Sequence, residues 1–192
     1  STGKCFDLGN TVSKALNVFR RIGEVFAGSS DPYSAGNGSI MRLAPIPMFF
    51  YPNLEAIERY ALESSRTTHG AVESLDACRL FSRIIHRALS GYSKEEILFT
   101  DKSIFTGSVK IVDIARGNYK DKVSFEIRGT GYVVDSLEAA LWCFYKTDNF
   151  KEAILMAANL GDDADTTASV CGQLAGAYYS VSGIPEHWLD KL

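Results

Sequence analysis

Apolar residues recur at helical spacing along most of this 192-residue chain. In residues 72–89, Leu75, Cys78, Phe81 and Ile85 follow one another at intervals of three or four. Such intervals place side chains on one face of an α-helix. The same spacing predicts helices over residues 11–22, 54–62, 93–98, 136–145, 149–160 and 164–180. A chain with this pattern is expected to fold as an all-α protein.

Local signals at the expected helix ends agree with this pattern. Asn10 or Thr11 can cap the first helix, because their side chains accept hydrogen bonds from free backbone N–H groups. Glu96 follows Ser93 by three residues, which is the spacing of a capping box. Glycines that can end a helix in the left-handed conformation follow three of the expected helices, at Gly23, Gly91 and Gly161.

The expected helix at residues 164–180 is rich in alanine, glycine and serine. Small side chains let another backbone approach closely, so we expect this helix at the centre of the fold. Alternation typical of strands is weak and limited to residues 108–112 and 122–127. No internal repeat or long linker divides the chain, and we expect one compact domain over residues 1–192.

Composition narrows the class of protein. A net charge of −3 argues against nucleic acid as a partner, since a nucleic-acid binder usually shows a basic face. It also argues against a basic segment on a membrane surface. The longest apolar stretch, residues 40–51, contains Arg42, Pro45 and Pro47 and is too short to span a membrane.

The termini and the cysteines bear on localisation. The N-terminal residues lack the basic and apolar regions of a signal peptide. The cysteines are far apart in the sequence and form no C-x-x-C pair. We therefore expect small buried thiols in a reduced, cytoplasmic protein. The four positions are Cys5, Cys78, Cys143 and Cys171.

Three aspartates lie within four residues at the expected start of the last long helix: Asp162, Asp163 and Asp165. One of them can be the N-cap, and the others can be solvated charges. Clustered carboxylates repel one another, and a divalent cation would remove that cost. Mg²⁺ takes oxygen ligands, so Asp163, Asp165 and the hydroxyl of Thr166 also form a candidate metal site. The pattern by itself leaves both interpretations open.

Two glycine-rich loops and one histidine are further candidates. Residues 34–39 read SAGNGS, in which glycines expose backbone N–H groups that can bind an anion at a helix start. Residues 128–132 read RGTGY and can bring backbone and an aromatic ring against a ligand. His69 lies between two expected helices. The sequence has no second histidine close to it, so a zinc site is not supported. Each feature also has a structural interpretation, as a turn, a helix cap or a surface histidine.

Taken together, these loops resemble one known family. The motifs that carry the resemblance are SAGNGSIMRLAPIP, TTHG, GTGYVVDSLEAALW and NLGDDADTTASVCGQLAGAYY. In this order, and over nearly the whole chain, they are similar to the ADP-ribosyl-glycohydrolases, the family of the dinitrogenase-reductase-activating glycohydrolase. The resemblance implies a compact orthogonal helix bundle with a cleft that holds two Mg²⁺ or Mn²⁺ ions. It also implies cleavage of the glycosidic bond between ADP-ribose and a modified protein side chain.

The resemblance further implies roles for particular residues. Asp163, Asp165 and Thr166 correspond to metal ligands, and Asp163 and Asp165 are the expected catalytic residues. Asp162 matches a position outside the ligand set. The expected ligands of the diphosphate, the neighbouring ribose and the rest of ADP-ribose are Ser34, Ala35, Gly36, Asn37, Gly38, His69, Gly131 and Tyr132.

One departure from the family pattern matters. Family members carry further metal ligands in an N-terminal region, in a G-D-x-x-G-type segment and a Thr-Asp-Asp run, and neither occurs here. The chain therefore resembles the C-terminal two-thirds of a member, with the N-terminal helices and the second set of metal ligands missing. We expect the protein's own N-terminal segment or another chain to cover apolar surface left open, for instance beside residues 164–180.

The same departure keeps alternative functions open. Besides an enzyme that acts on an ADP-ribosylated protein or an ADP-ribose derivative, the chain fits a catalytically incomplete ADP-ribose-binding module. It also fits a structural relative of the family. The sequence decides neither which ADP-ribose linkage is cut nor whether Mg²⁺ or Mn²⁺ is bound, because both ions accept this set of oxygen ligands.

Overall fold

The structure is a computed structural model that describes residues 8–99 and 105–191. These residues form α-helices and short 3₁₀ helices without a β-strand, so the expected all-α fold is confirmed. The α-helices are α1 (Asn10–Ile22), α2 (Pro45–Phe50), α3 (Leu54–Arg66), α4 (Val72–Leu89), α5 (Lys94–Phe99), α6 (Val109–Ala115), α7 (Val133–Lys146), α8 (Phe150–Ala158), α9 (Ala164–Tyr179) and α10 (Glu186–Leu189). The 3₁₀ helices are η1 (Pro32–Ser34), η2 (Asn37–Arg42), η3 (Ser124–Glu126) and η4 (Val181–Gly183).

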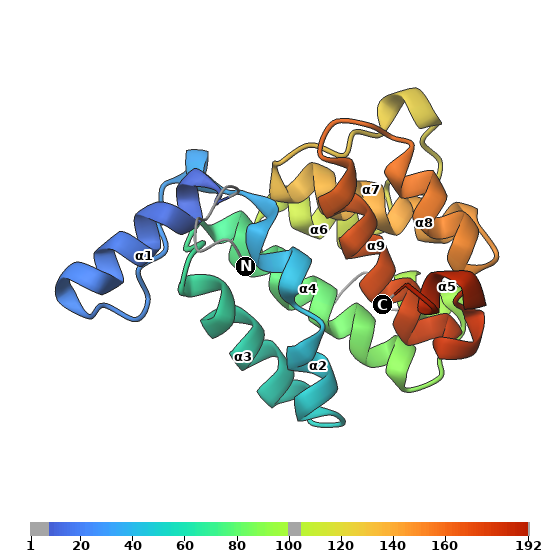
Figure 1. The fold of residues 1–192 in the computed structure, drawn as a ribbon, viewed down its shortest axis with the longest axis horizontal. Coiled ribbons are helices and arrows are strands. Elements are labelled where there is room, and N and C mark those ends of the chain that lie inside the picture. The colour runs from blue at the N-terminus through green and yellow to red at the C-terminus, as the bar shows by residue number, and fades with distance from the viewer. Residues whose placement is uncertain (1–7, 100–104, 192) are drawn as a thin grey trace.

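Helix α9 has a buried face and an outer face on which Asp165 and Ser169 are exposed. It packs against α4, α7 and α8, and also against η2 (Figure 1). Its buried face carries Val170, Cys171, Leu174 and Ala175. The contact between α9 and η2 matters for function, because it brings the start of the aspartate-rich helix next to the glycine-rich loop.

Most helix ends follow the local signals in the sequence. The Ser93 N–H donates to Glu96 Oε2 at 2.8 Å and the Glu96 N–H donates to Ser93 Oγ at 3.4 Å, which confirms the capping box. The start of α1 differs, because Gly9 occupies the N-cap position and no side chain caps the helix. Left-handed glycines follow three helices as predicted, with φ of 73° at Gly23, 77° at Gly91 and 79° at Gly161.

Both candidate strands were wrong. Residues 109–115 form helix α6, and residues 124–126 form the 3₁₀ helix η3. In α6 the buried side chains are Ile111 and Ile114, three residues apart, which is a helical interval. An alternation over five or six residues is too short to separate a strand from a single helical turn. The apolar stretch with its prolines is helical too, because Pro45 fits the start of α2.

Large apolar side chains are exposed on α1 and α2. Helix α1 projects from the rest of the bundle and buries only one of its residues (Figure 1). Leu16, Phe19 and Ile22 are 49%, 51% and 65% exposed along it. On α2, Met48 and Phe49 are 65% and 81% exposed. No large apolar side chain of α9 itself is exposed, but Met41 on η2 and Leu155 on α8, two elements that pack against α9, are 44% and 42% exposed.

The cysteines within the described part of the chain are free and buried. Cys78, Cys143 and Cys171 have the apolar role that the sequence predicted, while Cys5 lies outside the described residues. Burial raises the pKa of the Cys78 thiol to about 11, so this thiol is unreactive at neutral pH. Among the described helices, none is both long and apolar enough to cross a membrane.

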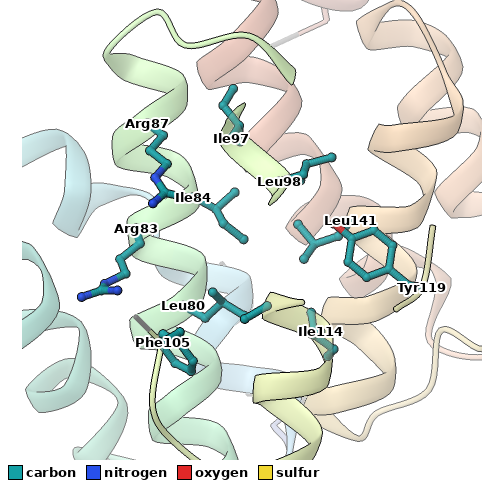
Figure 2. Close-up of a pocket in the computed structure, with 11 residues that line it drawn as sticks. Leu80, Arg83, Ile84, Arg87, Ile97, Leu98, Phe105, Ile114, Tyr119 and Leu141 are labelled. Atoms are coloured by element: carbon teal, nitrogen blue, oxygen red, sulfur yellow. The ribbon is translucent and has the colours of Figure 1, made fainter. Parts of the chain in front are cut away.

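A narrow cavity lies between α4, α5, α6 and α7 (Figure 2). Its volume of about 20 Å³ has room for one water molecule and none for a substrate. Leu80, Ile97 and Leu141 line it beside Tyr119. The Tyr119 hydroxyl is buried and makes no hydrogen bond with any described residue, and burial raises its pKa. The cavity is therefore part of the packing of the core and not a substrate site.

Tyr119→Phe is expected to stabilise the protein by about 1 kcal/mol, because it removes a buried hydroxyl that no described residue pairs. For a chain of this size the melting temperature should rise by about 2–4 °C. Differential scanning calorimetry checks this. Tyr179→Phe is the matched control, since the Tyr179 hydroxyl donates to Thr147 O at 3.4 Å and its loss should bring no gain. A Tyr119→Phe protein that melts lower than the wild type contradicts the prediction.

Candidate active site

Three loops and a histidine that are far apart in the sequence surround one cavity of about 500 Å³. We call it the acidic cavity. Residues 8–12, at the start of α1, form another part of its wall. It is lined by most of the residues that the sequence singled out, namely Gly36, Asn37, Gly38, His69, Gly131, Asp163, Asp165 and Thr166.

Asp163 sits at the N-cap position of α9, but its side chain does not cap the helix. Its Oδ2 atom instead accepts a hydrogen bond of 2.7 Å from the side-chain amide of Asn37. Asn37 is buried, and its amide also donates to Thr130 O at 3.3 Å. The carboxylate of Asp163 is therefore turned toward the glycine-rich loop, and capping does not explain its presence.

Asp165 and Thr166 complete the acidic wall from the first turn of α9. The carboxylate of Asp165 is exposed and has no hydrogen bond or ion pair with any residue in the described ranges. Oxygen donors of this kind suit a hard divalent cation. In the part of the chain that is described, no three histidine, cysteine, aspartate or glutamate side chains converge as a metal site. The donors fit a metal ion in type.

Asp162 is placed apart from this cluster. Its φ of 53° puts it in the left-handed region, and its carboxylate accepts from Arg128 Nη2 at 3.1 Å on the surface. Asp162 does not line the acidic cavity. The three adjacent carboxylates thus have three different environments, which their sequence spacing alone did not distinguish.

The glycine-rich loop is held by its own backbone hydrogen bonds. The N–H of Gly36 donates to Ser34 O at 2.8 Å, and that of Asn37 donates to Gly131 O at 3.0 Å. A bridge between Gly36 and Tyr132 ties the two glycine-rich loops together. These two N–H groups are already paired, so the donors offered to an anion at this loop must come from other atoms.

His69 packs directly against this loop. A Cβ atom on Gly38 would lie 2.8 Å from the ring carbon Cε1 of His69, so only glycine leaves room for the imidazole. The backbone of His69 is fixed as well, because its N–H donates to Ser65 O at 2.7 Å and its carbonyl accepts from Ser65 Oγ at 2.8 Å. Burial, and then the positive charge of Arg42, lowers the pKa of His69 to about 4.

His69 is expected to stay neutral down to about pH 5 in an NMR titration of its Cε1–H resonance, assigned with His69→Gln. In the unfolded chain the imidazole binds a proton near pH 6.5. The unfolded state then binds more protons between pH 6.5 and about 4, so the contribution of His69 to stability is lost as the pH falls through this window. A titration midpoint near 6.5 in the folded protein contradicts this result.

A second cavity, of about 610 Å³, adjoins the first, and Thr11, Gly36 and Gly131 line both. Ser34, Ala35 and Tyr132 lie here rather than in the acidic cavity. The predicted substrate-binding residues thus follow a path through two neighbouring hollows. Such a path suits an extended ligand better than a small one.

Tyr132 is anchored at the wall of the second cavity. Its hydroxyl donates to Glu73 Oε2 and accepts from Lys110 Nζ at 2.9 Å. Burial, followed by the bond to Glu73, raises the pKa of Tyr132. The ring is therefore held in one orientation by the carboxylate of Glu73 on α4 and the ammonium group of Lys110 on α6.

Sequence reasoning missed several residues at this site. Glu73, which is half-buried, and Lys110, which is exposed, lie in the first turns of α4 and α6, where charged side chains are ordinary, so no signal pointed to them. Arg42 and Thr68 also contribute, and both lie inside motifs that the sequence did mark, GSIMR and TTHG. Their connection is visible only in three dimensions, because Arg42 Nη2 donates to Thr68 Oγ1 at 2.8 Å across 26 residues.

Fold and cavity together define an all-α protein whose acidic helix start faces a glycine-lined hollow. A family model described as ADP-ribosylglycohydrolase matches residues 1–192. The chain belongs to the ADP-ribosylglycohydrolase family, as the motifs predicted.

Curated relatives and a solved structure agree with this assignment. The chain is 45% identical to the ADP-ribosylarginine hydrolase Tri1 of Pseudomonas putida (strain GB-1), over 99% of this chain and 51% of that protein. It is 31% identical to the ADP-ribosyl-[dinitrogen reductase] glycohydrolase of Rhodospirillum rubrum, over 97% of this chain and 60% of that protein. A solved structure named "ADP-ribosylglycohydrolase-related protein complex" superposes with a TM-score of 0.83 at 36% identity, covering 96% of this chain and 63% of that one. The chain thus spans about half to two-thirds of the length of these proteins.

Proposed function

We propose that this protein hydrolyses the glycosidic bond that joins ADP-ribose to a modified protein side chain. The observation that carries the proposal is the orientation of the Asp163 carboxylate. It does not cap helix α9 and instead accepts a hydrogen bond from the side-chain amide of Asn37 at the acidic cavity. A carboxylate that does not cap its helix, in the same cavity as a second one on Asp165, suits a hydrolytic site. The catalytic roles of Asp163 and Asp165 are part of the proposal.

The two adjoining cavities support ADP-ribose as the ligand. Its diphosphate and neighbouring ribose would lie against Ser34, Ala35, Gly36, Asn37 and Gly38, and the rest of the ligand would contact the others, His69, Gly131 and Tyr132. Binding along this path fixes the scissile bond next to Asp163 and Asp165. Positioning of this kind uses binding energy from the remote part of a ligand at the reacting end.

Enzymes of this family depend on metal ions. We propose that Asp163, Asp165 and Thr166 hold Mg²⁺ or Mn²⁺ and that the site takes two such ions. A bound divalent cation supplies a polarised water and orients hydroxyl groups of the sugar. Mg²⁺ prefers six oxygen ligands, so three protein donors leave further positions to water, to the substrate or to another segment.

We further propose that residues 1–192 form one domain and that the protein's own N-terminal segment, or another chain, completes it. The relatives extend well beyond the matched region. The exposed apolar side chains of α1, at Leu16, Phe19 and Ile22, lie on a helix whose first residues line the acidic cavity. A segment that covers α1 would therefore also reach the site, where it could supply the second set of metal ligands.

The free, buried cysteines fit a reducing, cytoplasmic environment.

The names of two relatives point to arginine as the modified side chain. These two, 45% and 43% identical to this chain, carry the name ADP-ribosylarginine hydrolase. We therefore propose a protein ADP-ribosylated on arginine as the substrate.

Release of free ADP-ribose from such a protein, in Mg²⁺ or Mn²⁺, tests the proposal. The chain should be assayed alone and together with the N-terminal segment of its relatives. Release from arginine-linked substrate that exceeds release from serine-linked substrate supports it. No release under either condition overturns the enzymatic function.

A catalytically incomplete ADP-ribose-binding module is the second candidate, because no complete set of metal ligands converges among the described residues. A thermal shift with ADP-ribose and Mg²⁺, without hydrolysis in the presence of the N-terminal segment, favours this candidate. The absence of both binding and hydrolysis leaves a structural relative of the family.

A further inference from the structure

The side chain of His69 is held by a chain of hydrogen bonds that begins at Arg42. Arg42 Nη2 donates to Thr68 Oγ1 at 2.8 Å, and Thr68 Oγ1 lies 2.8 Å from His69 Nδ1. Thr68 and His69 are buried, at 5% and 3% exposure. A guanidinium group can only donate, so the direction of the first hydrogen bond is fixed.

The direction of the second hydrogen bond decides the tautomer of the imidazole. A threonine hydroxyl carries one hydrogen, and within the described ranges His69 Nδ1 is the one acceptor that Thr68 Oγ1 meets. If Nδ1 carried the ring proton, the hydroxyl hydrogen would be buried without an acceptor, which is costly. The hydroxyl therefore donates to Nδ1, and the proton of the neutral ring lies on Nε2.

The nitrogen that carries this proton faces the glycine-rich loop. A Cβ atom placed on Gly36 would lie 3.3 Å from Nε2, and one placed on Gly38 would lie 3.1 Å from it. No residue in the described part of the chain accepts a hydrogen bond from Nε2, although His69 lines the acidic cavity. The site thus holds an unused N–H donor beside the loop whose own N–H groups, at Gly36 and Asn37, are already paired.

We propose that Arg42 and Thr68 are positioning residues that fix His69 as the Nε2–H tautomer, and that this N–H donates to an oxygen of the bound sugar diphosphate. The identity of the ligand rests on the proposed function, whereas the tautomer does not. The nearby charge of Arg42 opposes protonation of the ring, so the donor stays neutral and its hydrogen bond keeps one direction.

Nitrogen NMR of the histidine side chains tests the tautomer directly. The chain has three histidines, so the spectrum is simple, and His69→Gln assigns the signals of His69. The expected spectrum has Nδ1 of His69 in the range of an unprotonated ring nitrogen and Nε2 in the range of a protonated one. A wild-type spectrum with the proton on Nδ1 overturns the proposal.

Thr68→Val removes the hydroxyl but keeps the shape of the side chain, and Thr68→Ser keeps the hydroxyl. Thr68→Val is expected to give a mixture of tautomers and to weaken the binding of ADP-ribose about tenfold, as the loss of one hydrogen bond does. Thr68→Ser is expected to restore both. A Thr68→Val protein in which neither the tautomer of His69 nor the affinity for ADP-ribose changes overturns the proposal. An Nε2–H tautomer in a wild-type protein that does not bind ADP-ribose overturns the ligand and the proposed function, while the roles of Arg42 and Thr68 hold.

Discussion

Asp165→Asn is expected to lower the rate of ADP-ribose release roughly 10²–10³-fold without unfolding the protein. Under the proposed function Asp165 is a metal ligand. Loss of an outer partner of a metal ligand already costs roughly 10–100-fold, and loss of a ligand should cost more. Asp165 is exposed and makes no hydrogen bond or ion pair with any described residue, so its replacement should leave the melting temperature of the metal-free protein unchanged. Calorimetric titration with Mn²⁺ gives a second measurement, in which the variant should bind the ion far more weakly.

Asp162→Asn is the matched control, because it makes the same chemical change three residues away. Asp162 adopts a φ of 53°, which asparagine tolerates well, and its carboxylate pairs with Arg128 on the surface. Activity and Mn²⁺ affinity should stay within about threefold of the wild type, because exposed ion pairs contribute little. Equal losses of activity and Mn²⁺ affinity in both variants would show that the negative charge of the segment determines both quantities, and would contradict ligation by Asp165.

Gly70→Ala is expected to destabilise the protein by about 3 kcal/mol, at the upper end of the usual cost of overpacking. A Cβ atom on Gly70 would lie 2.5 Å from Gly28 O, a backbone atom that cannot rotate away. The same two segments are joined by a hydrogen bond of 3.0 Å from the Gly70 N–H to Ser29 O. Separating them should lower the melting temperature by about 6–12 °C in a calorimetric scan. It should also move the adjacent His69 and weaken ADP-ribose binding.

Gly9→Ala provides the comparison for this effect. Gly9 has a φ of −55°, and nothing lies within 4 Å of the position of its Cβ atom. Its substitution should change the melting temperature by less than about 2 °C, as expected for an exposed site. If Gly70→Ala melts like Gly9→Ala, the close approach of residues 28 and 70 does not exist in solution.

Local features of the sequence predicted the helices well, because their causes are local. The capping box of Ser93 and Glu96 and the left-handed glycine at Gly161 depend on neighbours within a turn. The errors occurred where local signals were short. Residues 108–112 alternate like a strand, yet they join helix α6 because Ile111 and Ile114 pack into the core together.

The sequence by itself determined the fold class, the family and the residues to consider at the site. It did so because helical periodicity and linear motifs are properties of neighbouring residues. Only the tertiary structure decided which atoms those residues contact. The hydrogen bond between Asn37 and Asp163 joins positions 126 residues apart, and the one between Arg42 and Thr68 spans 26. A carboxylate at an N-cap position can cap or turn away, and that choice depends on the partner that packing brings to it.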